Sequence, residues 1–346
     1  MVRLASIDIG SNAMRLEIVE IPESQLMDPL VPIHEISIKP VNFAGGSRVR
    51  MPIRLGMEAF SQNYFSQDKI QEVVSAFEYF KFEMENNNVD FYLTSATSAS
   101  RESMNGYEIP KAVFEKTGLR YRIIDGRKES QLLNMGLSAF YKDKKMSDIL
   151  IDLGGGSLEI NIRESGSVYF QDSLPLGTVR LMIESGFTNE QKMVQIIEQK
   201  LSRVKLFFKK QNFIDSFDYY LVPGGNAEDL VLMAKRFFNF DYKSSDILIN
   251  MPLCYIEKII DLIKPVESKF RAFRFNLRAD RADVIFQAAT IFKAIGQAAG
   301  VEMMSVPKVN LNDGIIYDLI NRIRRMKALN LDPYKTALAF NQIKKK

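Results

Sequence analysis

The chain has 346 residues and a formal net charge of +4; 46% of its residues are hydrophobic and 25% are charged. This composition is typical of a globular protein that is long enough for two domains. The small positive excess fits an acidic ligand but not a dedicated nucleic-acid binder, so we expect no specific nucleic-acid partner. One histidine, His34, and one cysteine, Cys254, exclude histidine or cysteine metal clusters, a histidine general base and an intramolecular disulfide.

The chemistry must therefore come from carboxylates, backbone amides, hydroxyl groups and arginines. Cys254 lies in an apolar run and is predicted to be a core thiol, and His34 is predicted to lie on a strand near the surface. The sequence shows no signal segment and no window of 18 apolar residues. We therefore expect a reduced, cytoplasmic protein with no membrane partner.

The first predicted elements are a strand, a turn and a return strand within residues 1–21. The run Ile7-Asp8-Ile9-Gly10-Ser11-Asn12 places an aspartate at a strand end, next to a small polar turn, and the return strand begins near Arg15. Residues 31–38 predict a third strand, and residues 42–51 predict a loop.

A helix is predicted from the N-cap Ser66 to the stop signal Asn86-Asn87-Asn88, because apolar residues recur there at helical spacing. The elements expected after it are a strand at 91–94, a helix at 107–117, a strand at 119–124 and a helix from about 126 to 140. Two charged residues stand out in this region. Arg101 either donates a bidentate pair to a phosphate or forms a surface ion pair with Glu102.

Glu129 lies in the first turn of the predicted helix at 126–140. It either stabilises the helix dipole or serves as a general base that points into a cleft.

The sequence Ile151-Asp152-Leu153-Gly154-Gly155-Gly156-Ser157-Leu158-Glu159 is the most informative stretch of the chain. It predicts a buried strand, a glycine turn and a return strand. Three glycines without Cβ atoms let backbone N–H groups approach an anion, and Ser157 adds a hydroxyl donor. Asp152 and Glu159 are hard oxygen ligands or bases. The run around Asp8 repeats this order, which suggests two half-sites that face each other across a cleft.

The rest of the chain continues the alternation of strands and helices. Predicted helices cover 189–211, 252–263, 266–274, 281–299, 311–327 and about 334–345. Predicted strands cover 219–222 and 301–309. After the first of these strands, Gly224 and Gly225 open a helix, which is a third anion-binding geometry.

The ordered motifs resemble the exopolyphosphatase / guanosine pentaphosphate phosphohydrolase (Ppx/GppA) family, within the actin, sugar kinase and heat-shock chaperone superfamily. The matching stretches are Ile7 to Asn12 with Arg15-Leu16, Ala96 to Glu102 with Asn105, Ile124-Asp125-Gly126 with Glu129, Asp152 to Glu159, Leu174 to Leu181, Gly224-Gly225 and Arg281-Ala282-Asp283. They extend from residue 7 to about 320, and together they are far more specific than any one alone.

The resemblance implies an α/β fold of two ribonuclease-H-like domains with an active site in the cleft between them. The domains are expected at 1–126 and 127–310, with helices at about 311–346 packing back on the first. The implied function is an exopolyphosphatase, a phosphoric anhydride hydrolase that uses Mg²⁺ or Mn²⁺ on inorganic polyphosphate, and that forms a homodimer. The alternatives are a guanosine pentaphosphate phosphohydrolase and a non-catalytic polyphosphate or nucleotide sensor.

The resemblance also assigns roles to residues. Glu129 is the implied catalytic base. Asp152 and Glu159 are the implied metal ligands, and Asp8 is the matching carboxylate of the first copy. The implied phosphate-binding residues are Ser11, Asn12, Arg15, Arg101, Gly154, Gly155, Gly156, Ser157, Gly224 and Gly225.

Six positions depart from the family pattern, and two of them are Ser130 and Gln131, which replace an alanine and an arginine. Lys128 replaces the first of two paired glutamates, Asn226 replaces a threonine, and Lys308 and Asn312 replace an aspartate and an arginine. The chain also ends before the HD-type domain of the larger members. From this ending we expect a preference for short polyphosphates.

Overall fold

The computed structural model describes residues 1–43, 46–138, 147–164, 167–186, 189–211, 217–243 and 245–340. Its internal contacts divide the chain into two compact units, Met1–Lys142 with Asn310–Lys346, and Asp143–Val309. The boundary expected at residue 126 falls at the start of a helix, α6, that belongs to the first unit. The end of the chain beyond residue 310 belongs to this unit as well.

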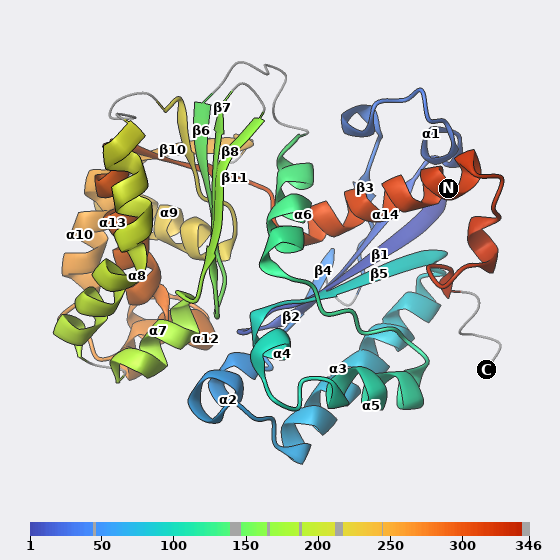
Figure 1. Ribbon diagram of the computed structural model, residues 1–346, viewed down its shortest axis with the longest axis horizontal. Coiled ribbons are helices and arrows are strands. Elements are labelled where there is room, and N and C mark those ends of the chain that lie inside the picture. The colour runs from blue at the N-terminus through green and yellow to red at the C-terminus, as the bar shows by residue number, and fades with distance from the viewer. Residues whose placement is uncertain are drawn as a thin grey trace. The chain divides into compact units, whose positions relative to one another are not determined.

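The first unit is a mixed sheet with helices on both faces (Figure 1). Its strands are β1 Val2–Ile9, β2 Met14–Ile21, β3 Lys39–Pro40, β4 Arg48–Met51 and β5 Phe91–Ala96. Its helices are α1 Glu23–Met27, η1 Ile33–Glu35, α2 Leu55–Gln62, α3 Gln67–Asn86, α4 Ser98–Glu102, α5 Glu108–Thr117, α6 Gly126–Ser138, α14 Leu311–Ala328 and η2 Pro333–Lys335.

Strand β1 is buried on both faces, as expected for a central strand with helices on either side. Its odd-numbered residues, such as Ile7, pack with α3 and α5, and its even-numbered residues, such as Leu4, pack with α14. Because side chains alternate along a strand, Asp8 lies on the same face as Leu4. The predicted N-cap Ser66 is confirmed: its side chain accepts a hydrogen bond from the N–H group of Lys69.

The second unit contains a mixed sheet with helices packed against one face (Figure 1). Its strands are β6 Ser147–Leu153, β7 Leu158–Glu164, β8 Ser167–Leu174, β9 Tyr219–Leu221, β10 Leu248–Pro252 and β11 Met303–Pro307. Its helices are α7 Thr178–Ser185, α8 Glu190–Gln211, α9 Gly225–Phe238, α10 Leu253–Ile263, α11 Ser268–Phe275, α12 Ala279–Ala282 and α13 Ile285–Ala299.

The two faces of this second sheet differ in chemistry. Ile149 and Ile151 of β6 join the apolar cluster with the helices, whereas Asp148 and Asp152 lie on the opposite face. On β7, Glu159 lies on that polar face because it is paired with Asp152 in the antiparallel register. The sheet therefore places its candidate ligands away from its apolar core.

The predicted fold class is confirmed: each unit has the strand arrangement of a ribonuclease-H-like domain. In the second unit, β8, β7 and β6 are antiparallel neighbours, and β9 and β11 continue the sheet in parallel with β6. In the first unit, β2 is antiparallel and β5 is parallel to β1. The fifth position of that sheet is held by only an isolated parallel bridge from Ile123 to Ala96.

Two predicted strands are wrong. Residues 31–38 contain no strand but the short helix η1, Ile33–Glu35, with His34 inside it, because Pro32 cannot donate to a strand ladder and its φ suits a helix start. Residues 119–124 form only the bridge at Ile123, because side chains of β5 take the backbone groups that a ladder would use. Thr94 Oγ1 bonds Arg120 O at 2.8 Å and Arg122 N at 3.0 Å.

Three further expectations are corrected. The loop expected at 42–51 ends in strand β4, which pairs with β2. The helix expected at about 334–345 is not formed where the structure describes this segment, up to residue 340. Instead Leu338 O accepts from Tyr92 N at 2.9 Å, and Phe340 N donates to Asp90 O at 2.8 Å. Cys254 is exposed because the buried face of α10 is formed by Ile256, Ile259 and Ile263.

Two expectations extend beyond the described residues. The last residues of the predicted helix 126–140 and the part of the terminal prediction after residue 340 lie outside them. Among the helices that the structure describes, none is long and apolar enough to cross a bilayer.

A buried carboxylate in the first unit predicts a pH-dependent stability. Burial raises the pKa of Glu17 to about 7, with Asp313 adding to the rise and Arg48 opposing it. The folded protein thus holds a proton that the unfolded chain releases near 4.5, the ordinary pKa of a glutamate side chain. The stability from this protonated form is complete below that value and is lost as the pH rises through about 7.

We expect Glu17→Gln to flatten this part of the pH dependence. Urea denaturation at pH 5, 6, 7 and 8 measures the free energy of unfolding, and the wild-type value should fall relative to the variant as the pH rises. Glu20→Gln, on the same strand, is the control. Parallel pH curves for wild type and Glu17→Gln would contradict the assignment.

Candidate functional site

The turn between β1 and β2 is closed by its own backbone. Gly10 N donates to Ala13 O at 3.0 Å, and a Cβ at Gly10 would lie 3.2 Å from the same oxygen, so glycine suits this tight turn. On either side of the turn, Asp8 of β1 and Arg15 of β2 lie opposite each other on the paired strands. Arg15 Nη1 contacts Asp8 Oδ2 at 2.5 Å. The structure therefore brings together two of the four predicted site residues of this hairpin as an ion pair.

Asp8 is buried, and burial raises its pKa, against the opposing effects of Arg15 and Arg50. A buried carboxylate with a raised pKa and a charged partner is a common feature of functional sites. Arg15 is the more accessible member, with 26% of its side chain exposed. It is therefore the member of the pair that a phosphate can reach.

Ser11 and Asn12, predicted to hold phosphate, are both buried in this turn. Ser11 Oγ lies 3.0 Å from Ser98 Oγ at the start of α4, and Ser11 O accepts from Gly56 N at 2.7 Å. These bonds fix the turn between α2 and α4. Sequence reasoning did not single out Ser98; its signal was only the run of small hydroxyl residues at 95–100.

Arg101 and Glu129, two predicted site residues of the first unit, lie next to each other, a contact that the sequence did not predict. Arg101 Nη1 lies 3.7 Å from Glu129 Oε2 and donates to Ile124 O at 2.8 Å. Glu129 is 4% exposed. The guanidinium attracts the ionised carboxylate and holds it in position. The first unit thus joins the candidate base to a candidate phosphate ligand.

The helix that carries Glu129 begins at an aspartate cap. Asp125 Oδ1 accepts from Lys128 N at 2.7 Å, which satisfies one of the free N–H groups of the first turn. The unusual Lys128 side chain is bound to α14, where its Nζ lies 3.0 Å from Asp318 Oδ1. Successive side chains of a helix point about 100° apart. Lys128 therefore contacts α14, whereas Glu129 lies beside Arg101.

The glycine turn of the second unit joins β6 to β7, as predicted. Asp152 pairs with Glu159 and Leu153 with Leu158, and Gly154 N donates to Ser157 O at 3.0 Å. The turn is covered by the start of α7. A Cβ at Gly177 would lie 2.2 Å from Gly156 N, so only glycine permits this approach.

The carbonyl groups of the three glycines are all bound by residues of α7. Thr178 N donates to Gly154 O at 3.0 Å, Val179 N donates to Gly155 O at 2.8 Å, and Arg180 Nε donates to Gly156 O at 2.7 Å. In a planar trans peptide the N–H group points opposite to the carbonyl group. The N–H groups of residues 155, 156 and 157 are therefore directed away from α7. We call these three N–H groups the cradle and expect them to bind an anion, because successive backbone N–H groups form such sites.

This packing predicts a large effect for one small substitution. Gly177→Ala places a methyl group on the backbone of the glycine turn, so we expect the turn to shift and stability to fall by about 1–3 kcal/mol. Urea denaturation measures the loss, and calorimetry with inorganic phosphate should show weaker binding. Gly186→Asn, at the other end of α7, is the control, since Gly186 has φ +81° and open space around it. Unchanged phosphate binding in Gly177→Ala would reject the cradle.

Asp152 and Glu159 place two carboxylates side by side on the polar face of the sheet. Glu159 is fully buried, and its Oε1 accepts from Ser173 Oγ at 2.9 Å. Like charges directly opposite on paired strands repel each other, and a divalent cation removes that cost. Ser157 Oγ is buried without a hydrogen-bond partner among the described residues, so it is available for a ligand oxygen. The residues present fit a hard cation and a phosphate.

The third predicted anion site follows β9, and its two glycines have different surroundings. Gly224 has φ +93° and open space beside it, while a Cβ at Gly225 would lie 2.6 Å from Arg281 Nη2. Asn226, which departs from the family pattern, accepts from Arg281 Nη1 at 2.5 Å and donates to Leu153 O at 3.4 Å. Asn226 thus connects the start of α9 to the end of β6, beside the glycine turn.

Comparison with known proteins agrees with this arrangement. The model of the Ppx/GppA phosphatase family matches residues 38–323. The bifunctional 3-dehydroquinate synthase/phosphatase of Fusobacterium nucleatum is 27% identical over 212 residues, which is 60% of this chain and 29% of that protein. Exopolyphosphatase 1 of Mycobacterium tuberculosis is 24% identical over 182 residues, which is 53% of this chain and 48% of that protein. The chain thus spans less than half the length of these relatives.

Solved structures share the fold. A crystal structure of an exopolyphosphatase from Cytophaga hutchinsonii superposes with a TM-score of 0.76 at 15% identity, over 92% of this chain and 98% of the other. The family member from Aquifex aeolicus gives a TM-score of 0.68 at 22% identity, over 93% and 98%. With the family model matching most of its length, the chain belongs to the Ppx/GppA phosphatase family.

Proposed function

We propose that this chain is an exopolyphosphatase that hydrolyses the terminal phosphate of inorganic polyphosphate. The observation that carries the proposal is the glycine turn of the second unit. Its three carbonyl groups are bound by α7, so its N–H groups and the hydroxyl of Ser157 are left for an anion. The name of the mycobacterial relative, an exopolyphosphatase, supports the same reading.

A divalent cation, Mg²⁺ or Mn²⁺, would be held by Asp152 and Glu159, with Asp8 of the first unit as a further candidate ligand. Such an ion neutralises phosphate oxygens and favours attack on phosphorus. Ser173 orients Glu159 through its 2.9 Å hydrogen bond. The protein supplies the remaining stabilisation through backbone amides, which cost no reorganisation during the reaction.

Glu129 would act as the base. It accepts a proton from water as the water oxygen bonds to the terminal phosphorus and the bridging P–O bond breaks, which releases orthophosphate and a chain shorter by one unit. Arg101, 3.7 Å from Glu129, keeps the carboxylate in place and can bind a phosphate oxygen. Arg15, Ser11 and Asn12 would hold the phosphate chain from the first unit. In this proposal both half-sites serve one substrate.

The finer expectations belong to the same proposal. The preference for short polyphosphates and the cytoplasmic location stay predictions from the sequence, and the homodimer stays a prediction of its own. Gly224 and Gly225 are proposed to contact a second phosphate of the chain, because Asn226 connects them to the strand that leads to the glycine turn.

Phosphate release measured side by side tests the proposal. The substrates are short polyphosphate, long polyphosphate and guanosine pentaphosphate, each with Mg²⁺, with Mn²⁺ and with a chelator. We expect metal-dependent release that is fastest from short polyphosphate. Faster release from guanosine pentaphosphate would show that this nucleotide, and not polyphosphate, is the preferred substrate. No release from any of the three would favour a non-catalytic sensor of polyphosphate or nucleotide.

A further inference from the structure

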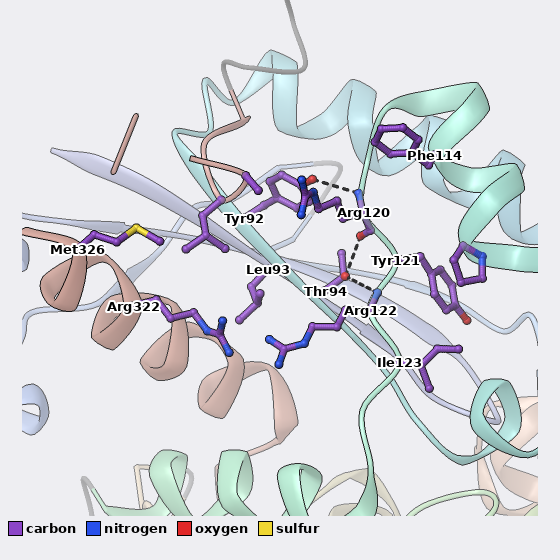
Figure 2. Close-up of a pocket in the computed structure, with 13 residues that line it drawn as sticks. Tyr92, Leu93, Thr94, Phe114, Arg120, Tyr121, Arg122, Ile123, Arg322 and Met326 are labelled. Atoms are coloured by element: carbon purple, nitrogen blue, oxygen red, sulfur yellow. Dashed lines mark hydrogen bonds between the residues drawn. The ribbon is translucent and has the colours of Figure 1, made fainter. Parts of the chain in front are cut away.

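A cavity of about 800 Å³ lies within the first unit, apart from the candidate site residues. It is lined by β5, the segment 120–123, the last turns of α14 and residues 337–338 (Figure 2). We call it the β5 pocket. All of its lining residues belong to the first unit, so its shape does not depend on the second.

The pocket forms where the edge of the sheet is interrupted. Tyr92 N donates to Leu338 O at 2.9 Å, and Ala96 N donates to Arg122 O at 2.7 Å. Amide directions alternate along a strand, so Thr94 directs its N–H group to the same edge, between these two bonds. The Thr94 hydroxyl bonds Arg120 O and Arg122 N, which keeps the neighbouring segment one side-chain length away. A strand edge with a hydrogen-bond donor therefore forms the floor of the pocket.

The wall of the pocket is positively charged. The guanidinium groups of Arg122 and Arg322 point toward each other across the cavity in Figure 2. Arg322 Nε lies 3.0 Å from Asp318 Oδ2, but the same carboxylate also binds Lys128 at 3.0 Å. One carboxylate thus pairs with two cations. The loss of water at the cavity wall and the charge of Arg322 lower the pKa of Arg122, and Asp318 opposes them.

The other wall is apolar. Leu93 lies next to the two guanidinium groups, and Met326 lies one turn beyond Arg322 on α14 (Figure 2). Phe114, with 49% of its surface exposed, also lines the pocket. A volume of about 800 Å³ is in the range of pockets that hold small organic molecules. Paired arginines bind planar carboxylates and phosphates through several N–H groups at once.

We propose that the β5 pocket binds a small organic anion. Its carboxylate or phosphate group bridges Arg122 and Arg322, and its apolar or aromatic body covers Leu93 and Met326. A nucleoside monophosphate and a medium-chain fatty acid share this chemistry. The proposal does not depend on the activity of the candidate active site.

Calorimetric titrations with adenosine monophosphate, octanoate and inorganic phosphate test the proposal, on wild type, Arg122→Gln and Arg322→Gln. Arg325→Gln is the matched control, since Arg325 is an exposed arginine of the same helix outside the pocket. We expect one of the two organic anions to bind, which identifies its class. Both pocket variants should weaken binding at least tenfold, whereas the control and Asp152→Asn should not.

Thermal unfolding without ligand shows whether each variant is folded, so that weaker binding is not confused with misfolding. Arg122→Gln removes repulsion from Arg322, so its melting temperature should equal or exceed that of the wild type. Three results would overturn the proposal. The first is no binding of either organic anion, and the second is equal affinity in Arg122→Gln and wild type. The third is inorganic phosphate that binds as tightly as both organic anions and is weakened by Arg122→Gln, since phosphate bound at the glycine turn would not respond to that substitution.

Discussion

Glu129→Gln is expected to lower the rate of phosphate release from polyphosphate by a factor of about 10²–10⁴, the usual contribution of a general base. The amide keeps the size of the side chain and its place beside Arg101, but it cannot accept the proton of the attacking water. The fold should be retained, because the helix that carries Glu129 is capped by Asp125 and not by Glu129 itself. Malachite-green detection of orthophosphate measures the rate.

The control for this experiment is Glu102→Gln, at the exposed end of α4. Sequence reasoning left open whether Arg101 pairs with Glu102, and the structure shows Arg101 beside Glu129. Glu102→Gln should therefore keep nearly full activity. If Glu129→Gln released phosphate at the wild-type rate, the base would have to be another residue.

Asp152→Asn is expected to raise the metal concentration needed for half-maximal activity by at least about tenfold. The substitution preserves volume but removes one of two paired negative charges, and each tenfold change corresponds to about 1.4 kcal/mol of binding free energy. Activity at saturating metal should recover in part, because the glycine turn and Glu159 are unchanged. Titration of activity with Mg²⁺ and with Mn²⁺ measures the midpoint.

The control is Asp241→Asn, an accessible carboxylate of the second unit with 94% of its side chain exposed. It should leave the metal midpoint unchanged. A midpoint in Asp152→Asn equal to that of the wild type would show that this carboxylate does not hold the ion.

Local patterns made the glycine turn and the helix start at Ser66 predictable. A short apolar strand, three glycines and a return strand specify a hairpin through nearby residues alone. The match between Asp152 and Glu159 follows from the same local spacing. The sequence also limited the residue types that can act in the site, since one histidine and one cysteine exclude histidine or cysteine metal clusters and a histidine general base.

Contacts between distant segments could not be predicted. Residues 119–124 have strand composition, yet Thr94 and Tyr92 bind their backbone through side chains, and nothing in the local pattern indicates this. The closeness of Gly177 to Gly156, across 21 positions, was equally hidden, so the role of α7 in orienting the turn emerged only from the structure. Pairing of Lys128 with Asp318 is a third example.

The most direct test is a crystal structure with Mn²⁺ and a slowly hydrolysed polyphosphate analogue, with the ion located by its anomalous scattering. We expect an ion bound to Asp152 and Glu159 and the terminal phosphate bound to the N–H groups of residues 155–157. We also expect Glu129 to reach that phosphorus through one water molecule. An ion bound elsewhere, or Glu129 separated from the terminal phosphate by more than one water, would contradict it.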